Sequence, residues 1–325
     1  MESIALLYRQ KKDGRYSMER LFEPLESLPN VNRVELPCEL DSVWNFFKLL
    51  LFAIKIKERN IHITGDVHYM AFILFWKKVA LTIHDLNHYE ELTGIRKKLY
   101  SLIWFWLPIK MTSTIAVISP YTKKQLKQYF KCENKKIHVI NNRFNEIQKK
   151  SPAKTNGKFN ILVIGTRKNK NIEELLNSIQ NIHIYHITII GKLNDHTKQI
   201  IENKGISFSN YWDLNDDGLA IQYNSADVLF FASTKEGFGL PILEAQSVGL
   251  PVITSNTTAM PYVAGKGAIL VNPNSSQEIS NALEKFRLEL PIREQFISEG
   301  YKNINRFNEK DFIKSYLELY KIYFN

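Results

Sequence analysis

Short, continuous apolar runs alternate along the chain with segments whose apolar residues recur at helical spacing. The second half shows this most clearly, where FNILVIG (159–165) precedes the helical pattern NIEELLNSIQN (171–181). Further strand-like runs are IYHITIIG (184–191), ISFSNYW (206–212), ADVLFFAS (226–233) and PVIT (251–254), and helical spacing recurs in LAIQYNSA (219–226) and PILEAQSVG (241–249). Continuous apolar strands separated by helices are typical of a parallel, doubly wound sheet.

The first half shows the same alternation with weaker punctuation. Its strand-like runs are SIALLYR (3–9), NIHITG (60–65), KVALTIHD (78–85), TIAVIS (114–119) and KIHVINN (136–142). A chain of 325 residues exceeds the size at which one core usually stops growing. We therefore predict an α/β protein with domains at 1–150 and 151–307, joined near the polar stretch KKSPAKTNGK (149–158).

Charge is distributed unevenly between these halves. Residues 1–150 hold 25 Lys and Arg against 15 Asp and Glu, whereas residues 151–325 hold 18 of each. The first half would attract nucleic acid, anionic lipid or a phosphorylated substrate. No aromatic RNA-binding strand motif or zinc finger occurs, so we expect no nucleic-acid partner.

Two apolar segments raise the question of a membrane. FFKLLLFAIKIK (46–57) and LIWFWLPIKM (102–111) are too short or too broken by lysine to span a bilayer. Their Trp, Phe and Leu beside Lys suit the membrane interface, and core helices with basic ends are the alternative. The N-terminus lacks signal-peptide features, and Cys38 and Cys132 form no disulfide or zinc pattern. We expect a cytoplasmic protein, with peripheral binding to the inner face of the membrane left open.

The stretch STKEGFGLPILEAQSVGLPVI (233–253) carries the candidate chemistry. A strand ends there, a turn follows, and Pro241 fits the first position of a helix. Gly237 and Gly239 remove side chains ahead of that helix, so backbone N–H groups and the positive end of the helix dipole would face a ligand. The pattern predicts an anion-binding turn.

Two carboxylates flank this turn and are expected to act separately. Glu236 lies in the loop, whereas Glu244 falls in the first helical turn. Glu244 suits the hydroxyls of a nucleotide ribose, and Glu236 suits the group attached to the phosphates. The alternative is that each only favours the helix N-terminus electrostatically, by about 0.3–1 kcal/mol.

The sequence E-G-F-G-L-P-I-L-E (236–244) resembles the E-x7-E motif of retaining nucleotide-sugar glycosyltransferases of family 4. The resemblance continues through 244–273 and 161–176, and it includes TIHDL (82–86), VISPYTKKQL (117–126) and VINNRF (139–144). It implies the GT-B fold, in which two doubly wound Rossmann-like domains face a central cleft. It also implies that the C-terminal helix, at 308–325, packs back on the first domain.

The resemblance assigns roles to individual residues. Glu236 would contact the donor sugar, Glu244 the ribose, and His84 the transferred sugar from the opposite side. Lys170 and Arg167 would neutralise the leaving diphosphate, although GTRKNKN (165–171) is shorter than the usual family spacing, which favours Lys170. The remaining donor-side positions are Gly14, Gly165, Gly237, Phe238, Gly239 and Leu240.

No metal or other cofactor is expected beside the nucleotide-sugar donor. Departure of a nucleoside diphosphate needs preorganised positive charge, which Lys170, Arg167 and the helix N-terminus would supply. DLNDD (213–217) lacks Asp-x-Asp spacing and suits a helix cap. His84 and His88 have a metal-like spacing, but a strand ends at His84.

The resemblance thus implies a retaining glycosyltransferase for bacterial-type surface polysaccharide. Its acceptor would be a hydroxyl of a saccharide or lipid-linked saccharide, with His62, Asp66 and His68 shaping that side. A sugar-nucleotide hydrolase or epimerase, or a non-catalytic binding subunit, remains as an alternative. A dinucleotide oxidoreductase fits poorly, because GFGLPI (237–242) lacks the third glycine of the G-x-G-x-x-G fingerprint.

Overall fold

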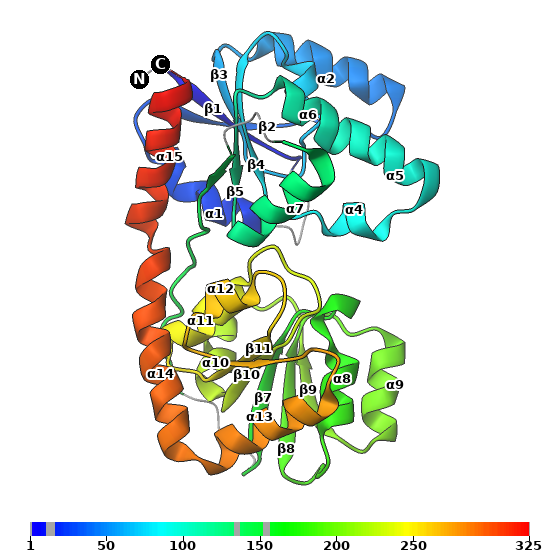
Figure 1. Cartoon of the computed structure of the whole chain (residues 1–325), viewed down its shortest axis with the longest axis vertical. Coiled ribbons are helices and arrows are strands. Elements are labelled where there is room, and N and C mark those ends of the chain that lie inside the picture. The colour runs from blue at the N-terminus through cyan, green and yellow to red at the C-terminus, as the bar shows by residue number, and fades with distance from the viewer. Residues whose placement is uncertain (1, 11–16, 133–136, 152–156, 325) are drawn as a thin grey trace. The chain divides into compact units, whose positions relative to one another are not determined.

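The computed structural model describes residues 2–10, 17–132, 137–151 and 157–324, and the chain divides into two compact units. Unit 1 comprises Met1–Arg143 and Asn308–Asn325, and unit 2 comprises Phe144–Phe307. Among the described residues each unit holds one six-stranded sheet in which all neighbouring strands are parallel (Figure 1). The division falls at residues 143–144, ahead of the expected linker at 149–158, of which 152–156 lie outside the described residues.

Unit 1 carries its sheet in the order β2-β1-β3-β4-β5-β6. The strands are β1 (Ile4–Tyr8), β2 (Val31–Glu35), β3 (Asn60–Ile63), β4 (Lys78–Ile83), β5 (Thr114–Val117) and β6 (Ile137–Val139). The helices are α1 (Ser17–Glu26), α2 (Val43–Lys55), α3 (Met70–Ile73), α4 (Asn87–Glu91), α5 (Gly94–Tyr100), the π-helical η1 (Ser101–Trp106), α6 (Leu107–Met111), α7 (Pro120–Phe130) and α15 (Glu309–Tyr323). One core packs α2, α3, α6 and α7 on one face of the sheet, and a second packs α1 and α15 on the other.

The C-terminal helix α15 belongs to the core of unit 1. Asn308 caps it by accepting a hydrogen bond from the backbone N–H of Asp311. Its buried stripe, Phe312, Tyr316, Leu319 and Tyr320, packs on the face of β1 that carries Ile4 and Leu6. The helical spacing of residues 311–324 predicts this stripe, and the structure buries all four side chains.

Unit 2 carries its sheet in the order β12-β11-β10-β7-β8-β9. The strands are β7 (Phe159–Ile164), β8 (Tyr185–Ile190), β9 (Ser207–Tyr211), β10 (Val228–Phe231), β11 (Val252–Ser255) and β12 (Ile269–Val271). The helices are η2 (Lys168–Lys170, 3-10), α8 (Ile172–Ser178), α9 (Asp195–Asn203), α10 (Asp216–Ser225), α11 (Leu240–Ser247), α12 (Met260–Ala264), α13 (Ser276–Leu288), α14 (Leu290–Ile304) and η3 (Asn305–Phe307, 3-10). Within DLNDD (213–217) the capping side chain is not an Asp but Asn215, which accepts from the N–H of Gly218.

The strand orders place a topological switch point in each sheet, between β1 and β3 in unit 1 and between β7 and β10 in unit 2. Ligands of doubly wound sheets bind at the carboxyl ends of the strands beside such a point. Ligands are therefore expected at the loops after β1, β3, β7 and β10. No helix of the described residues has the length and apolar character needed to cross a bilayer.

Candidate active site

In unit 2, hydrogen bonds fasten the loop after β7 to the loop after β10, across the switch point. The backbone N–H of Thr234 donates to the carbonyl of Asn169 at 2.9 Å. The Asn169 side chain donates to the Lys235 carbonyl at 2.9 Å. Asn171, in a left-handed conformation at φ 63°, donates from its side chain to the carbonyls of Ala232 (3.2 Å) and Pro273 (2.6 Å). Asn169 and Asn171 were not among the predicted site residues, although asparagine is a residue that tolerates the left-handed backbone conformation of Asn171.

Lys170 and Glu236 meet at this junction. Lys170 Nζ lies 2.5 Å from Glu236 Oε1, and the two side chains are only 16% and 17% exposed. Asn169 Nδ2 donates to the same carboxylate oxygen at 3.1 Å. Lys170 Nζ also lies 4.4 Å from the centroid of the Phe231 ring. The sequence assigned the lysine and the glutamate separate partners, whereas here they bind each other.

Gly165 makes room for the Lys170 side chain. It has φ 90°, and a Cβ at this position would come within 2.8 Å of Lys170 Cε. Arg167, the other basic candidate, precedes η2 with an exposed side chain. Of the two basic candidates, Lys170 is therefore the one that contacts Glu236.

The glycine turn ends directly at the N-terminus of α11. Gly239 is its N-cap with φ 115°, and a Cβ there would lie 3.2 Å from Ile242 Cδ1 and Met260 Sδ. The helix begins at Leu240, so Pro241 occupies its second position rather than the expected first. Phe238 is buried with its ring edge-on to that of Phe307. Its side chain thus belongs to the core, and only its backbone is available to a ligand.

Glu244 is placed differently from the sequence expectation. Because α11 begins at Leu240, Glu244 lies in the second helical turn rather than the first. Its Oε2 accepts a hydrogen bond from the hydroxyl of Tyr223, on α10, at 2.6 Å. Burial raises the pKa of the Glu244 carboxyl, and the Tyr223 hydrogen bond opposes that rise. Tyr223 was not among the predicted site residues, although a tyrosine on the buried side of a helix usually requires a partner for its hydroxyl.

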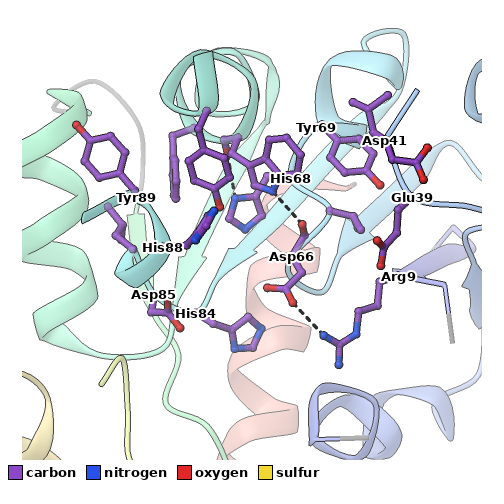
Figure 2. A pocket seen from close by; sticks show the side chains of 16 residues that line it. Arg9, Glu39, Asp41, Asp66, His68, Tyr69, His84, Asp85, His88 and Tyr89 are labelled. Carbon is purple, nitrogen blue, oxygen red and sulfur yellow. Dashed lines mark hydrogen bonds and ion pairs between the residues drawn. The ribbon is translucent and has the colours of Figure 1, made fainter. Parts of the chain in front are cut away.

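Unit 1 has a pocket of about 490 Å³ at the carboxyl ends of its strands (Figure 2). Arg9 follows β1, Asp66 and His68 follow β3, and His84 and Asp85 follow β4. The lining carboxylates are Glu39, Asp41, Asp66 and Asp85, and the lining aromatic residues are Tyr69, Tyr89, Tyr100, Trp104 and Phe105. Of the two histidines proposed with Asp66 for this side, His68 lines the pocket.

Arg9 contributes positive charge to this pocket but is already paired. Figure 2 shows it directed at Asp66, with Nη1 2.9 Å from Oδ2. Its Nε lies 3.2 Å from Glu19 Oε1. Asp66 is held in turn, because Trp104 Nε1 donates to its backbone carbonyl at 3.1 Å. The lining therefore carries more negative than positive charge.

His84 stands at the end of β4 with one ring nitrogen engaged. Nε2 lies 2.7 Å from the carbonyl of Thr64, and since a carbonyl only accepts, this nitrogen carries the proton. In the neutral ring Nδ1 is then a hydrogen-bond acceptor. His68 donates from Nδ1 to the Trp104 carbonyl at 2.9 Å, and burial lowers its pKa to about 4.

A further sequence candidate, His62, lies elsewhere in unit 1. His62 does not shape the pocket: it is fully buried, with Nδ1 2.6 Å from the Tyr320 hydroxyl and Nε2 2.8 Å from Thr82 Oγ1. It therefore joins β3 to α15 inside unit 1. Gly14 lies outside the described residues.

Comparison with known proteins identifies both parts of the chain. Residues 10–145 match the family model described as Glycosyltransferase Family 4, and residues 143–303 match the one described as Glycosyl transferases group 1. The O-antigen chain mannosyltransferase RfbU of Salmonella typhimurium is 25% identical over 264 residues, which cover 77% of this chain and 71% of that protein. An uncharacterized 41.2 kDa protein in the cps region of Klebsiella pneumoniae is 29% identical over 184 residues, 55% of this chain and 49% of that one.

Solved structures share the fold over the whole chain. Sucrose-phosphate synthase from Thermosynechococcus elongatus has a TM-score of 0.81 at 14% identity, covering 100% of this chain and 99% of that chain. Anabaena Alr3699/HepE, solved in complex with UDP and glucose, has a TM-score of 0.79 at 16% identity, covering 99% and 100%.

The fold and these matches define a glycosyltransferase of the GT-B class. The two family models together span residues 10–303, and the chain belongs to glycosyltransferase family 4. The predicted fold and enzyme class are therefore confirmed. The roles of the individual site residues stay predictions.

Proposed function

We propose that this protein transfers a hexose from a nucleotide-diphosphate sugar to a saccharide hydroxyl, with retention of anomeric configuration, in the synthesis of a bacterial surface polysaccharide. The proposed binding of the donor rests on the Lys170–Glu236 pair. This pair lies beside the N-terminus of α11, at the switch point between β7 and β10. This grouping places an ammonium group from the loop after β7 beside a carboxylate in the loop after β10, which leads to the N-terminal backbone N–H groups of α11.

Each group has a role in the proposed reaction. As the diphosphate leaves, negative charge develops on it, and Lys170 and the α11 N-terminus stabilise that charge. Lys170 then exchanges Glu236 for phosphate, which leaves the Glu236 carboxylate to accept hydroxyl hydrogen bonds from the sugar. A hydrogen bond to a charged group contributes about 1.5–3 kcal/mol, so the bond that Lys170 gains with phosphate offsets the one that it loses with Glu236. Glu244, positioned by Tyr223, accepts from the ribose, and the proposal assigns no step to a metal ion.

The acceptor is proposed to enter the unit 1 pocket as a neutral sugar. Carboxylates accept hydrogen bonds from hydroxyls and repel phosphate, and Arg9 is offset by Asp66 and Glu19. The excess of basic residues in 1–150 lies in the half of the chain that forms this pocket. It favours an acceptor carried on a lipid at the cytoplasmic face of a membrane. The names of the relatives make mannose the first sugar to test.

Turnover with defined donors and acceptors tests this proposal. Purified protein is screened for stabilisation by UDP, GDP, ADP, TDP and CMP, and the matching nucleotide sugars are then assayed with neutral and anionic oligosaccharides. We expect product only when donor and neutral acceptor are both present. NMR of the product should show that the transferred sugar keeps the anomeric configuration it had in the donor. Donor consumption without acceptor would indicate a hydrolase or epimerase, binding without turnover a binding subunit, and an inverted anomer would rule out retention.

A further inference from the structure

Exposed apolar side chains line one side of α2. Trp44, Phe47, Leu51 and Ile54 follow the spacing i, i+3, i+7, i+10 and are 79%, 52%, 61% and 63% exposed. We call these four residues the α2 stripe. The opposite side of α2 buries Leu49 and Ala53 in the core of unit 1. The helix is therefore apolar on both sides, and packing within unit 1 accounts for only one of them.

A second stripe runs along the continuous helical segment α5–η1–α6. Ile95, Leu99, Leu102 and Trp106 follow the spacing i, i+4, i+7, i+11, and each is at least 42% exposed. We call these residues the α5–α6 stripe. The short helix α3 packs against both α2 and α6, and Phe75 just after it is 67% exposed. The two stripes thus belong to helices that cover the same face of the unit 1 sheet (Figure 1).

Within the two helical segments that carry the stripes, the charged residues are all basic. The sequence contains no Asp or Glu in residues 42–57 or 92–113. Lys48 and Lys55 are exposed on α2, and Lys98 is exposed on α5. Lys110 Nζ lies 3.9 Å from the centroid of the Trp106 ring. Apolar residues bordered by lysines, with tryptophan among them, are typical of helices that lie in a membrane interface.

We propose that unit 1 binds the surface of an anionic lipid bilayer through the α2 stripe and the α5–α6 stripe. The apolar side chains enter the interface, and the neighbouring lysines contact anionic headgroups. Charge complementarity selects this occupant over a second copy of the chain, because stripe-to-stripe contact would bring these lysines together. A helix stripe of four large apolar residues otherwise exposes them to water without compensation.

The segment that carries the second stripe also reaches the pocket. Tyr100 and Trp104 line the pocket from the same helical segment on which Leu102 and Trp106 are exposed. Membrane binding would therefore hold the pocket close to the lipid surface, where the sugar of a lipid-linked acceptor lies. This consequence rests on the proposed function, whereas the membrane contact does not.

Vesicle flotation of the full chain tests the contact. Wild type is compared with W44S/F47S/L51S, with K48E/K55E and with the control L288S/L290S, whose leucines lie in unit 2 and are 63% and 62% exposed. We expect binding to vesicles of phosphatidylglycerol and phosphatidylcholine, a loss of at least ten-fold in both α2 variants, and no loss in the control. Each variant is also tested for thermal unfolding and for turnover with a soluble acceptor. If both are unchanged from wild type, the variants are folded.

Three results would overturn the proposal. The first is that wild type does not bind anionic vesicles at low salt, and the second is that an α2 variant binds them as well as wild type does. The third is a wild-type dimer that the W44S/F47S/L51S substitutions dissociate while lipid has no effect, which would assign the stripes to a second copy. Vesicle binding without sugar transfer on any acceptor would leave this inference standing and count only against the proposed function.

Discussion

Lys170 Nζ and Glu236 Oε1 lie 2.5 Å apart although the two residues are 66 positions apart in the chain. The parallel pairing of β7 with β10 brings their loops together, and both side chains are largely shielded from water. Each therefore holds the other's charge in place at the edge of the sheet where a doubly wound domain binds its ligand. A bound diphosphate would replace one partner of this pair.

Removal of the lysine should abolish most of the transfer reaction. We expect Lys170→Ala to lower kcat by about 10²–10³-fold, because one preorganised group that stabilises developing charge contributes this much. Glu236→Ala should reduce turnover similarly by removing the acceptor of sugar hydroxyl hydrogen bonds. Lys168→Ala, two residues away with an exposed side chain, is the matched control. Initial rates at saturating donor measure the effect, and near-normal turnover in both site variants would refute the assignment.

Tyr223 should control the pH range of nucleotide binding through Glu244. Its hydrogen bond lowers the pKa of a carboxyl whose pKa burial raises, so Tyr223→Phe raises that pKa further. A protonated carboxyl is a poor acceptor of hydrogen bonds from ribose hydroxyls, so nucleotide binding weakens. The loss of nucleotide affinity on acidification then begins at a higher pH than in wild type. We expect about a ten-fold loss of affinity near neutral pH, measured by calorimetry between pH 5 and 8.

A second Tyr–Glu pair in the same unit supplies the control for Tyr223. The Tyr185 hydroxyl donates to Glu284, and Tyr185 stands at the amino end of β8, the edge of the sheet away from the candidate site. Tyr185→Phe should affect stability and leave nucleotide affinity unchanged. Equal losses in both variants would show that the Tyr223 effect is only structural.

His84 should act through the ring nitrogen that the protein leaves as an acceptor. Since Nε2 donates to the Thr64 carbonyl, Nδ1 is available to a substrate hydroxyl. We expect His84→Ala to lower kcat/KM by about ten-fold, the size of one neutral hydrogen bond. His183→Ala, exposed on unit 2, is the control. Steady-state kinetics with varied acceptor concentration measure kcat/KM for both variants. An unchanged kcat/KM in His84→Ala would show that His84 does not contact the substrate.

Acid should destabilise unit 1 through His62. Burial lowers its pKa from 6.5 to about 3, so below pH 6.5 the unfolded chain binds a proton that the native state does not. Stability therefore falls as the pH drops, by up to about 1.4 kcal/mol per pH unit. His62→Gln should be less stable at pH 7 but lose less between pH 7 and 4. Denaturant unfolding measures both, with exposed His196→Gln as the control that keeps the wild-type slope.

Much of the fold was predictable from local sequence. Buried parallel strands are continuous apolar runs, and FNILVIG (159–165) and ADVLFFAS (226–233) contain β7 and β10 as predicted. The turn before α11 follows from Gly239, whose left-handed backbone strongly favours glycine, and from Pro241, which suits a helix start. Such features depend on neighbours within a few residues, so the sequence alone contains them.

Relationships between distant residues could not be predicted in this way. The binding of Lys170 to Glu236, of Tyr223 to Glu244 and of His62 to Tyr320 depends on which strands and helices become neighbours. The sequence likewise showed that residues 46–57 are apolar and basic but not which side of the helix is covered. Only the packing of α2 on the sheet and α3 settles that Leu49 is buried and Trp44 is exposed. The sequence by itself thus determined the elements, the enzyme class and the chemical types at the site. The tertiary structure decided their partners, because hydrogen bonds and burial depend on distances in space that no local pattern encodes.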